Sequence, residues 1–312
     1  MNQYTFQQLS DENIKDLPYI FQSAFGKHVD VNYFRKKFDT ERFGCKNVGF
    51  IAYSNKGEPA AFYGVFPCLV EFQGDLVLVA QSGDTMTHVN HRGKGLFVNL
   101  AKQTYDYAQT QGIKIVFGFP NENSYPGFVR KLNWQHKEDL SAFLIRAKCL
   151  PWIRAKKYFK ISEEFHFAFV RKKLHQFPKG KPFKNSVINN EFGGIQHSED
   201  YFRYKTYHEN FLISIEGKSL WVKPEGMHLL IGNIEKCDPN TFLKIIKQLK
   251  KFCFWTGIPY LRYQCSPDVE YEAYFSKHGK KNTIKYPVGY VDFGCDFDFG
   301  KIKFTASDND NF

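Results

Sequence analysis

The sequence has 312 residues, 43% of them hydrophobic and 18% aromatic, so it can bury a substantial core and is not expected to be disordered. This length exceeds that of most single compact domains and favours two. A formal net charge of +11 suits nucleic acid, a membrane surface or a phosphorylated ligand. Because the basic residues are scattered along the chain, we favour solvated faces together with a phosphate-bearing cofactor over nucleic acid as the explanation of the charge.

The cysteines, the N-terminal sequence and the lengths of the apolar runs indicate in which compartment the protein is expected. Seven cysteines are spread along the chain without a Cys-x-x-Cys pair, and they do not cluster with histidines at metal-ligand spacing. We therefore expect reduced thiols and no bound metal. The N-terminus lacks a signal-peptide pattern, and no apolar run approaches the roughly 20 residues that span a bilayer. A cytoplasmic protein without a membrane span is predicted.

The first half begins with helical patterns and continues with strands. Apolar residues recur at helical spacing from Asn13 to Phe25, and Gly26 is placed to end this helix. A second helix is expected around Tyr33 and Phe38. Short strands separated by turn residues follow, and they are expected at Val48–Tyr53, Ala60–Val65, Leu69–Phe72, Leu76–Ala80 and Asp84–Val89.

The last of these strands leads into a glycine-rich turn. The turn reads Arg92-Gly93-Lys94-Gly95, a helix follows from Leu96 to Gln111, and Ile113–Phe119 is a buried strand. Antiparallel strands followed by a strand–turn–helix–strand unit predict an α/β (α+β) fold, with a mixed, mostly antiparallel sheet flanked by helices.

The second half repeats this order. Strands are expected at Phe211–Ile215, Leu220–Lys223 and His228–Ile234, followed by a helix from Asn240 to Phe254 and a strand at Tyr260–Gln264. The sequence therefore predicts two copies of one fold, at 1–150 and 151–312. At the position of the glycine-rich turn the second copy has 235–240, which contains no glycine, so it is expected to have lost the turn.

The turn at 92–95 is suited to an anion. Glycines let the backbone approach a ligand closely, and the first N–H groups of the following helix lack intrahelical partners at the positive end of the helix dipole. Arg92 and Lys94 add positive charge. A pyrophosphate is the expected ligand.

This segment resembles motif A of the GNAT acyltransferases, Arg/Gln-x-x-Gly-x-Gly/Ala. Arg92 matches the first position and Gly95 the first glycine, whereas Phe97 replaces the last small residue. The resemblance implies that acetyl-CoA binds as co-substrate, with its pyrophosphate on the turn and its pantetheine arm along the preceding strand and near an asparagine-containing loop. The cofactor-binding residues implied are Met86, Thr87, Val89, Arg92, Gly93, Lys94, Gly95, Leu96, Phe97, Asn121 and Asn123.

Transfer to an amine needs a group that accepts the amine's proton and one that protonates the leaving thiolate. Asp84 is placed on the strand that should hold the thioester, and His88 is a second candidate base. The tyrosine that GNAT enzymes often use as an acid aligns with Val129, so Tyr125 nearby is the substitute.

The resulting hypothesis is a tandem-GNAT acyltransferase in which the second copy shapes the acceptor site. By analogy the acceptor is a small-molecule amine such as an amino sugar or nucleotide sugar of a surface polysaccharide. Two alternatives stay open: a Fem-type aminoacyl transferase that uses charged tRNA, and a non-catalytic module that binds CoA or a polyanion.

Overall fold

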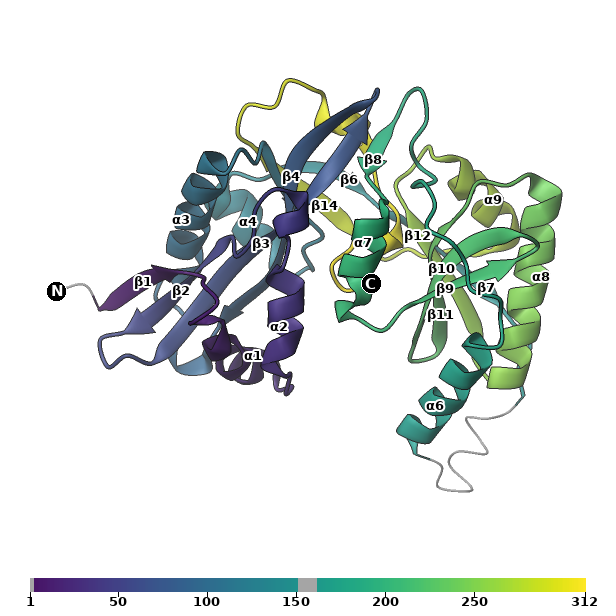
Figure 1. The fold of residues 1–312 in the computed structure, drawn as a ribbon, viewed down its shortest axis with the longest axis horizontal. Coiled ribbons are helices and arrows are strands. Elements are labelled where there is room, and N and C mark those ends of the chain that lie inside the picture. The colour runs from purple at the N-terminus through teal and green to yellow at the C-terminus, as the bar shows by residue number, and fades with distance from the viewer. Residues whose placement is uncertain (1–2, 151–161) are drawn as a thin grey trace. The chain divides into compact units, whose positions relative to one another are not determined.

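The computed structural model describes residues 3–150 and 162–312. The chain divides into two compact units, and Figure 1 labels most of their helices and strands. Unit 1 comprises 1–138, 203–207 and 287–300, and unit 2 comprises 139–202, 208–286 and 301–312. The sequence suggested contiguous halves, whereas each unit includes segments from the opposite half of the chain.

Unit 1 is built on one mixed sheet with strand order β1-β2-β3-β4-β5-β14-β6. β1 to β4 form antiparallel neighbours, β5 runs parallel to β4, and β14 is antiparallel to β5. The strands are β1 (Tyr4–Gln8), β2 (Gly49–Ser54), β3 (Pro59–Phe72), β4 (Asp75–Thr87), β5 (Ile115–Gly118), β6 (Gln135–Asp139) and β14 (Pro287–Asp292).

Helices cover both faces of this sheet. Alternate residues of β3 point to opposite faces, so Phe62 and Phe66 join one hydrophobic cluster and Tyr63 and Val65 the other. The first cluster includes residues of α1 (Leu17–Phe25) and α2 (Val31–Phe38), and the second includes residues of α3 (Leu96–Thr110) and α4 (Tyr125–Leu132). The arrangement is a three-layer α/β fold, which confirms the predicted fold class (Figure 1).

In two places, two strands that were predicted to follow each other form one long strand. Ala60–Val65 and Leu69–Phe72 both lie in β3, and Phe66 and Pro67 between them belong to the ladder, where Pro67 pairs with Ala80. Likewise, Leu76–Ala80 and most of Asp84–Val89 lie in β4. A proline is tolerated in a strand where its missing N–H is not needed, so local turn chemistry was overridden by pairing.

Other predicted boundaries agree well. Gly26 ends α1 in the left-handed conformation, and Gly112 follows α3 with φ +81°. The segment predicted to begin α1 instead forms a short 3₁₀ turn at Ile14–Asp16 before the α-helix starts.

Unit 2 is built on a second sheet, with strand order β13-β7-β12-β11-β10-β9. Its strands are β7 (Ser141–Arg146), β9 (Phe211–Ile215), β10 (Lys218–Glu225), β11 (His228–Ile234), β12 (Tyr260–Cys265) and β13 (Lys280–Lys281), and a parallel pair is formed by β8 (Gly193–Ile195) and β15 (Ile302–Lys303). Its helices are α6 (Glu163–Leu174), α7 (Glu199–Tyr204, of which 203–204 belong to unit 1), α8 (Pro239–Thr256) and α9 (Glu270–His278).

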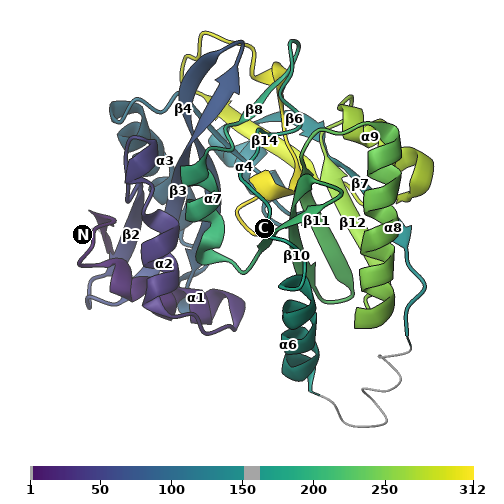
Figure 2. The same cartoon turned by 45° about the vertical axis from the view of Figure 1, so that its right-hand side comes forward.

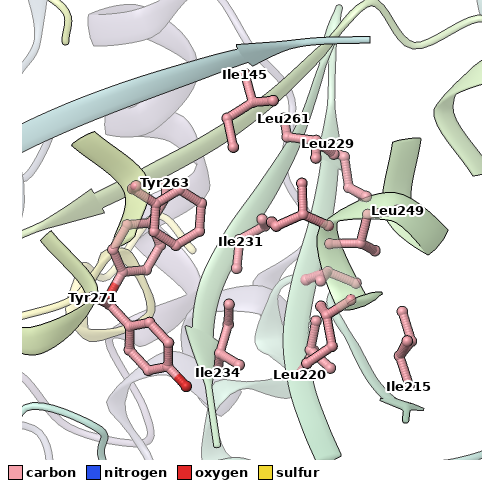
Figure 3. Packing of buried hydrophobic residues seen from close by; sticks show 14 of the residues in the cluster. Ile145, Ile215, Leu220, Leu229, Ile231, Ile234, Leu249, Leu261, Tyr263 and Tyr271 are labelled. Atoms are coloured by element: carbon pink, nitrogen blue, oxygen red, sulfur yellow. The ribbon is translucent and has the colours of Figure 1, made fainter. Parts of the chain in front are cut away.

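The core of unit 2 lies between α8 and its sheet. Leu249 of α8 packs in one cluster with Leu229 and Ile231 of β11, as the close-up in Figure 3 shows. α8 extends along the strands in Figure 2. Ile145 of β7 belongs to the same cluster and is drawn with it in Figure 3. The helix and strands predicted for 211–264 are therefore confirmed to within a few residues.

The two sheets share an order of elements, and each sheet includes one strand from the other half of the chain. In each, three antiparallel strands are followed by a helix and a parallel strand: β2-β3-β4-α3-β5 in unit 1 and β9-β10-β11-α8-β12 in unit 2. Next to β5 lies β14, from the C-terminal half, and next to β12 lies β7, from the N-terminal half. Each sheet is therefore completed by a strand from the other half of the chain.

Candidate functional site

The turn between β4 and α3 is formed by two glycines in the left-handed conformation. Gly93 has φ +75° and Gly95 has φ +73°, values that residues with a side chain rarely adopt. A Cβ added at either position would have no heavy atom within 4 Å, so the space beside both glycines is open. Glycine is thus required here by the backbone, and the open space leaves room for a ligand close to it.

The N-terminus of α3 presents a group of backbone donors. Gly95 is the N-cap and has no side chain to cap the helix, and Asn99 N to Gly95 O is the first bond into it, at 3.3 Å. In the described part of the chain, none of the N–H groups of residues 93–98 donates to a protein acceptor. Together with the helix dipole, these donors make a site for an anion.

Basic side chains surround this turn. Lys94 Nζ lies 5.8 Å from the centre of the Tyr4 ring, and the Tyr4 hydroxyl is 2.9 Å from Nδ1 of His91. A guanidinium nitrogen of Arg92 donates to the carbonyl of Ala24 at 3.4 Å. Desolvation, followed by the charges of Lys94 and His88, lowers the pKa of His91. The neighbourhood therefore disfavours further positive charge and suits a negatively charged ligand.

Leu96 and Phe97 fix the start of α3. Leu96 is buried in the core, whereas Phe97 packs edge-on against Phe128 of α4, with ring centres 5.2 Å apart. A Cβ on Gly127 would lie 3.3 Å from Phe97 Cε1, so this glycine provides the room for the larger side chain. The Phe97 side chain thus packs into the contact between α3 and α4, although the GNAT motif has a small residue at this position.

β4 is no longer paired with β5 beyond Gln81, along the residues that lead to the turn. The two strands pair only at Ala80↔Val116 and Gln81↔Phe117, whereas the other edge of β4 stays paired with β3 through Thr87. Among the described residues, the β5-facing edge of β4 beyond Gln81 therefore has no strand partner. Thr87 lies on this segment with the buried Met86, and Val89 follows it, half exposed, with its N–H donating to Ser23 Oγ. An extended ligand could pair with this edge.

Asp84 lies in a bulge on the same segment. The register between β3 and β4 shifts here, and Asp84 has φ +48°, a left-handed conformation that aspartate and asparagine tolerate better than most residues. One of its carboxylate oxygens is 2.8 Å from Nζ of Lys37, which is fully buried on α2. Lys37 also contacts the Phe66 ring and the Tyr33 hydroxyl.

His88 is engaged in local structure. Its Nδ1 accepts a hydrogen bond from the N–H of Asn90 at 3.3 Å and so caps the 3₁₀ turn Val89–His91. Its ring stacks on Tyr19 with centres 5.2 Å apart. Four residues of strand correspond to about 13 Å, so His88 lies well away from Asp84 along the chain.

The loop after β5 brings three further predicted residues together. The side-chain oxygen of Asn121 accepts hydrogen bonds from the N–H groups of Asn123 and Ser124, both at 3.0 Å, and thereby stabilises the turn before α4. Asn123 is exposed. The Tyr125 hydroxyl is 2.8 Å from Nδ1 of His136, a neighbour that sequence reasoning missed.

Comparisons with known proteins identify this part of the chain. Residues 5–136 match the family described as "Acetyltransferase (GNAT) domain". They contain β1 to β5, the glycine turn and α3. Residues 5–136 form a GNAT domain. This part of the chain is thus an acetyltransferase domain of the GNAT type, as predicted.

Solved structures show the same fold at low identity. The GCN5-related N-acetyltransferases of Kribbella flavida and Anabaena variabilis have TM-scores of 0.60 and 0.60, with 11% and 12% identity. These matches cover 93% and 93% of this chain and 72% and 73% of theirs. A structure described as a glucosamine N-acetyltransferase region of a fungal multi-domain GH3 β-N-acetylglucosaminidase matches at TM-score 0.51 and 12% identity, over 92% of this chain and 38% of that one. No curated protein matches the sequence.

A buried chain of hydrogen bonds supports the divergent part of β4 in the GNAT domain. It leads from Trp134 Nε1 to the hydroxyls of Tyr105 and Tyr63 and on to Ser82 Oγ, with distances of 2.8, 2.9 and 2.8 Å. Burial raises the pKa of both tyrosines. The residues come from α3, β3, β4 and the segment between α4 and β6, so no spacing in the sequence could have indicated this network.

The corresponding corner of unit 2 is closed. Asp238 caps α8, and its carboxylate accepts hydrogen bonds from the N–H groups of Asn240 and Thr241 at 2.9 and 3.1 Å. A carboxylate therefore occupies the position at which an anion would bind, and proline at the first helical position removes a further donor.

The end of the chain packs where β11 and β12 separate in unit 2. These strands pair as far as Ile231↔Tyr263, after which Ser266 N donates to Phe304 O at 2.8 Å. A Cβ on Gly232 would overlap the ring of Phe312. The C-terminal segment thus packs beside the ends of β11 and β12 in unit 2.

Two further features of the described residues concern other classes of site. They contain no group of three or more His, Cys, Asp or Glu side chains placed to hold a metal ion. None of the helices in the described ranges is long and apolar enough to cross a bilayer.

Proposed function

We propose that the GNAT domain binds acetyl-CoA and transfers its acetyl group to an amine. The observation that carries this proposal is the set of backbone N–H groups at 93–98, which have no protein acceptor in the described chain, beside two left-handed glycines. The CoA pyrophosphate accepts hydrogen bonds from these groups, and Arg92 and Lys94 add positive charge. Met86, Thr87 and Val89 belong to the edge along which the pantetheine arm extends.

The unpaired edge of β4 supports the position of the thioester. A pantetheine arm that starts at the turn and follows the edge backwards reaches the bulge at Asp84 after a few residues of strand. His88 lies near the pyrophosphate end of this path, and its Nδ1 already accepts a hydrogen bond. Asp84 is therefore the group we assign to the acceptor amine.

The reaction is nucleophilic attack of the neutral amine on the thioester carbonyl, followed by loss of the CoA thiolate. Asp84 accepts a hydrogen bond from the amine, orients it and takes up the proton released as the N–C bond forms. Lys37 is buried beside this carboxylate, and protonation of Asp84 leaves the Lys37 ammonium without its counter-charge. Asp84 therefore releases the proton again soon after taking it up.

Tyr125 is the group we assign to the leaving thiolate. Its hydroxyl donates a proton to the sulfur, and His136, 2.8 Å away, can return a proton to the phenolate. Asn121 has a smaller role than expected, since its side-chain oxygen is used by the turn before α4, which leaves its amide N–H groups and those of Asn123 for the pantetheine.

For the acceptor we propose an amino sugar, free or as a nucleotide sugar. This finer assignment rests on analogy, to which the fold similarity to a glucosamine N-acetyltransferase region adds support. It has a direct test: acetyl-CoA is incubated with the protein and a panel of amino sugars, nucleotide amino sugars, polyamines and peptide amines, and released CoA thiol is measured.

We expect thiol release that depends on an amino sugar. Release with peptide amines alone would overturn the choice of acceptor but keep the acyl transfer. Acetyl-CoA binding without release for any amine would favour the CoA-binding module, and transfer from charged tRNA with no acetyl-CoA binding would favour the Fem-type enzyme.

For unit 2 we propose a degenerate GNAT-like copy that binds no CoA. Its order of elements matches that of the GNAT domain, but Asp238 and Pro239 occupy the corner equivalent to the glycine turn. The C-terminal residues Phe304 and Phe312 pack where a pantetheine arm would otherwise extend.

A further inference from the structure

A cavity of about 620 Å³ lies within unit 2, beside β9. One wall is the segment after α6, which is held against this strand by backbone hydrogen bonds from Ser214 N to Pro178 O at 2.7 Å and from Gly180 N to Leu212 O at 2.9 Å. The absence of a side chain at Gly180 allows this approach, because a Cβ there would be 2.6 Å from the carbonyl oxygen of Ile213. The wall is therefore fixed by the fold.

Lysines from two parts of unit 2 line this cavity. Lys179 and Lys181 flank Gly180 in the extended wall segment, and residues two apart in such a segment point to the same side. Lys184 follows in the chain, and Lys236 comes from the opposite wall, after β11. In the described part of the chain, no carboxylate lies within ion-pair distance of Lys179 or Lys181.

The single acidic residue of the lining is already compensated. Glu235 is 3.3 Å from Nζ of Lys218 and accepts a hydrogen bond from Ser219 N at 2.9 Å. Although partial burial opposes it, these bonds lower the pKa of Glu235. Lys236 Nζ donates to the carbonyl of Ile188 at 2.8 Å, whereas the charges of Lys179 and Lys181 meet no carboxylate of the lining other than this compensated one.

We propose that this lysine pocket binds a phosphate ester of a small molecule, with a diphosphate as the preferred group. Several ammonium groups converging on one cavity recognise a multiply charged anion, and lysine is a common phosphate ligand. The volume lies in the range of small-molecule sites, roughly 300–1,000 Å³. The buried Phe183 and Ile188 in the lining offer apolar contact to the rest of the ligand.

This pocket is distinct from the corner before α8. Its lining reaches Glu235 and Lys236 but includes no residue of α8, whose first N–H groups are bonded to Asp238. The proposal therefore does not depend on a second CoA site, nor on the function proposed for the GNAT domain.

The test is calorimetric titration of the full chain with inorganic pyrophosphate. The wild-type protein should bind at two sites, the glycine turn and the lysine pocket. The double substitution Lys179→Glu with Lys181→Glu should weaken the pocket at least about tenfold, since it replaces attraction by repulsion. The matched control, Lys247→Glu with Lys251→Glu on the exposed face of α8, makes the same charge change and should leave both sites intact.

Each outcome separates the two proposals. Gly95→Asp should remove only the site at the turn; if it has no effect, the CoA site fails while the lysine pocket stands. Equal affinities in the Lys179→Glu/Lys181→Glu variant and its control would overturn the pocket. Equal affinities of the pocket for inorganic phosphate and pyrophosphate would also overturn the proposal. The same holds if an RNA oligonucleotide binds to these lysines and pyrophosphate does not displace it.

Discussion

The ammonium of Lys37 lies 2.8 Å from a carboxylate oxygen of Asp84, and this ion pair connects the buried cation of α2 to the bulge of β4. Removing one partner of such a buried pair costs roughly 3–5 kcal/mol, whereas removing both costs far less. The pair therefore links the stability of the GNAT domain to the residue that we assign to the acceptor amine, and a pair of substitutions can separate these two roles.

Asp84→Asn should lower turnover on the true acceptor by roughly 10²–10⁴-fold while acetyl-CoA binding stays near normal, because asparagine tolerates the left-handed backbone but cannot accept the proton. The double variant Lys37→Met with Asp84→Asn should recover stability, measured by thermal unfolding, without recovering turnover. If the double variant regains activity, Asp84 acts only through the ion pair. Loss of activity in His88→Ala with full activity in Asp84→Asn would instead make His88 the base.

Gly95→Asp should abolish acetyl-CoA binding. The substitution places a side chain and a negative charge beside the N–H groups of α3, and its backbone conformation also disfavours most side chains. The measurement is the rise in melting temperature on adding acetyl-CoA, which follows from ligand binding to the folded state. Gly74→Asp, at another left-handed glycine of unit 1 with open space around it, is the matched control for backbone strain and charge. An unchanged ligand-induced shift in Gly95→Asp would show that the turn is only structural.

One acetyl-CoA should bind per chain. The corner before α8 already holds the Asp238 carboxylate, and Phe304 and Phe312 fill the separation of β11 and β12. Isothermal titration with acetyl-CoA should give a stoichiometry near one, which Gly95→Asp should reduce to zero. A value near two in the wild-type protein would mean that unit 2 retains a working cofactor site.

The affinity for CoA should rise as the pH falls from about 7 to 5.5. Desolvation and the charges of Lys94 and His88 lower the pKa of His91 in the free protein, and a bound pyrophosphate should raise it again. A group whose pKa is higher in the complex takes up a proton on binding, so lower pH favours the complex. His91→Gln should remove this component and leave only the titration of the CoA phosphates, as measured by dissociation constants across the range. An identical pH dependence in both proteins would show that His91 does not sense the ligand.

An isolated fragment of residues 1–150 should not fold stably. Its sheet would lack β14, which pairs with β5 through Gly289↔Gly118 to Asp292↔Ile115, while β7 would lose its partner β12. Exposed strand edges of this kind favour aggregation. Circular dichroism and thermal unfolding of the fragment, compared with the full chain, give the measurement. A cooperative transition at the temperature of the full chain would show that the exchanged strand is dispensable.

Much of the GNAT domain follows from local sequence. Helical periodicity and a terminal glycine gave the ends of α1 and α3, and the strand–turn–helix pattern at 84–111 located the candidate pyrophosphate site. These features are decided by the conformational freedom of Gly93 and Gly95 and by residues a few positions apart, so their cause lies within one segment.

What only the tertiary structure decided depends on residues far apart in the chain. The exchange of β7 and β14, the Lys37–Asp84 pair and the closing of unit 2 by Phe312 all join segments separated by tens to hundreds of residues. Even Pro67, a local signal for a turn, lies within β3 because pairing with Ala80 outweighs it. Strand partners are selected by the burial of whole sheet faces, a free-energy term that no short segment contains.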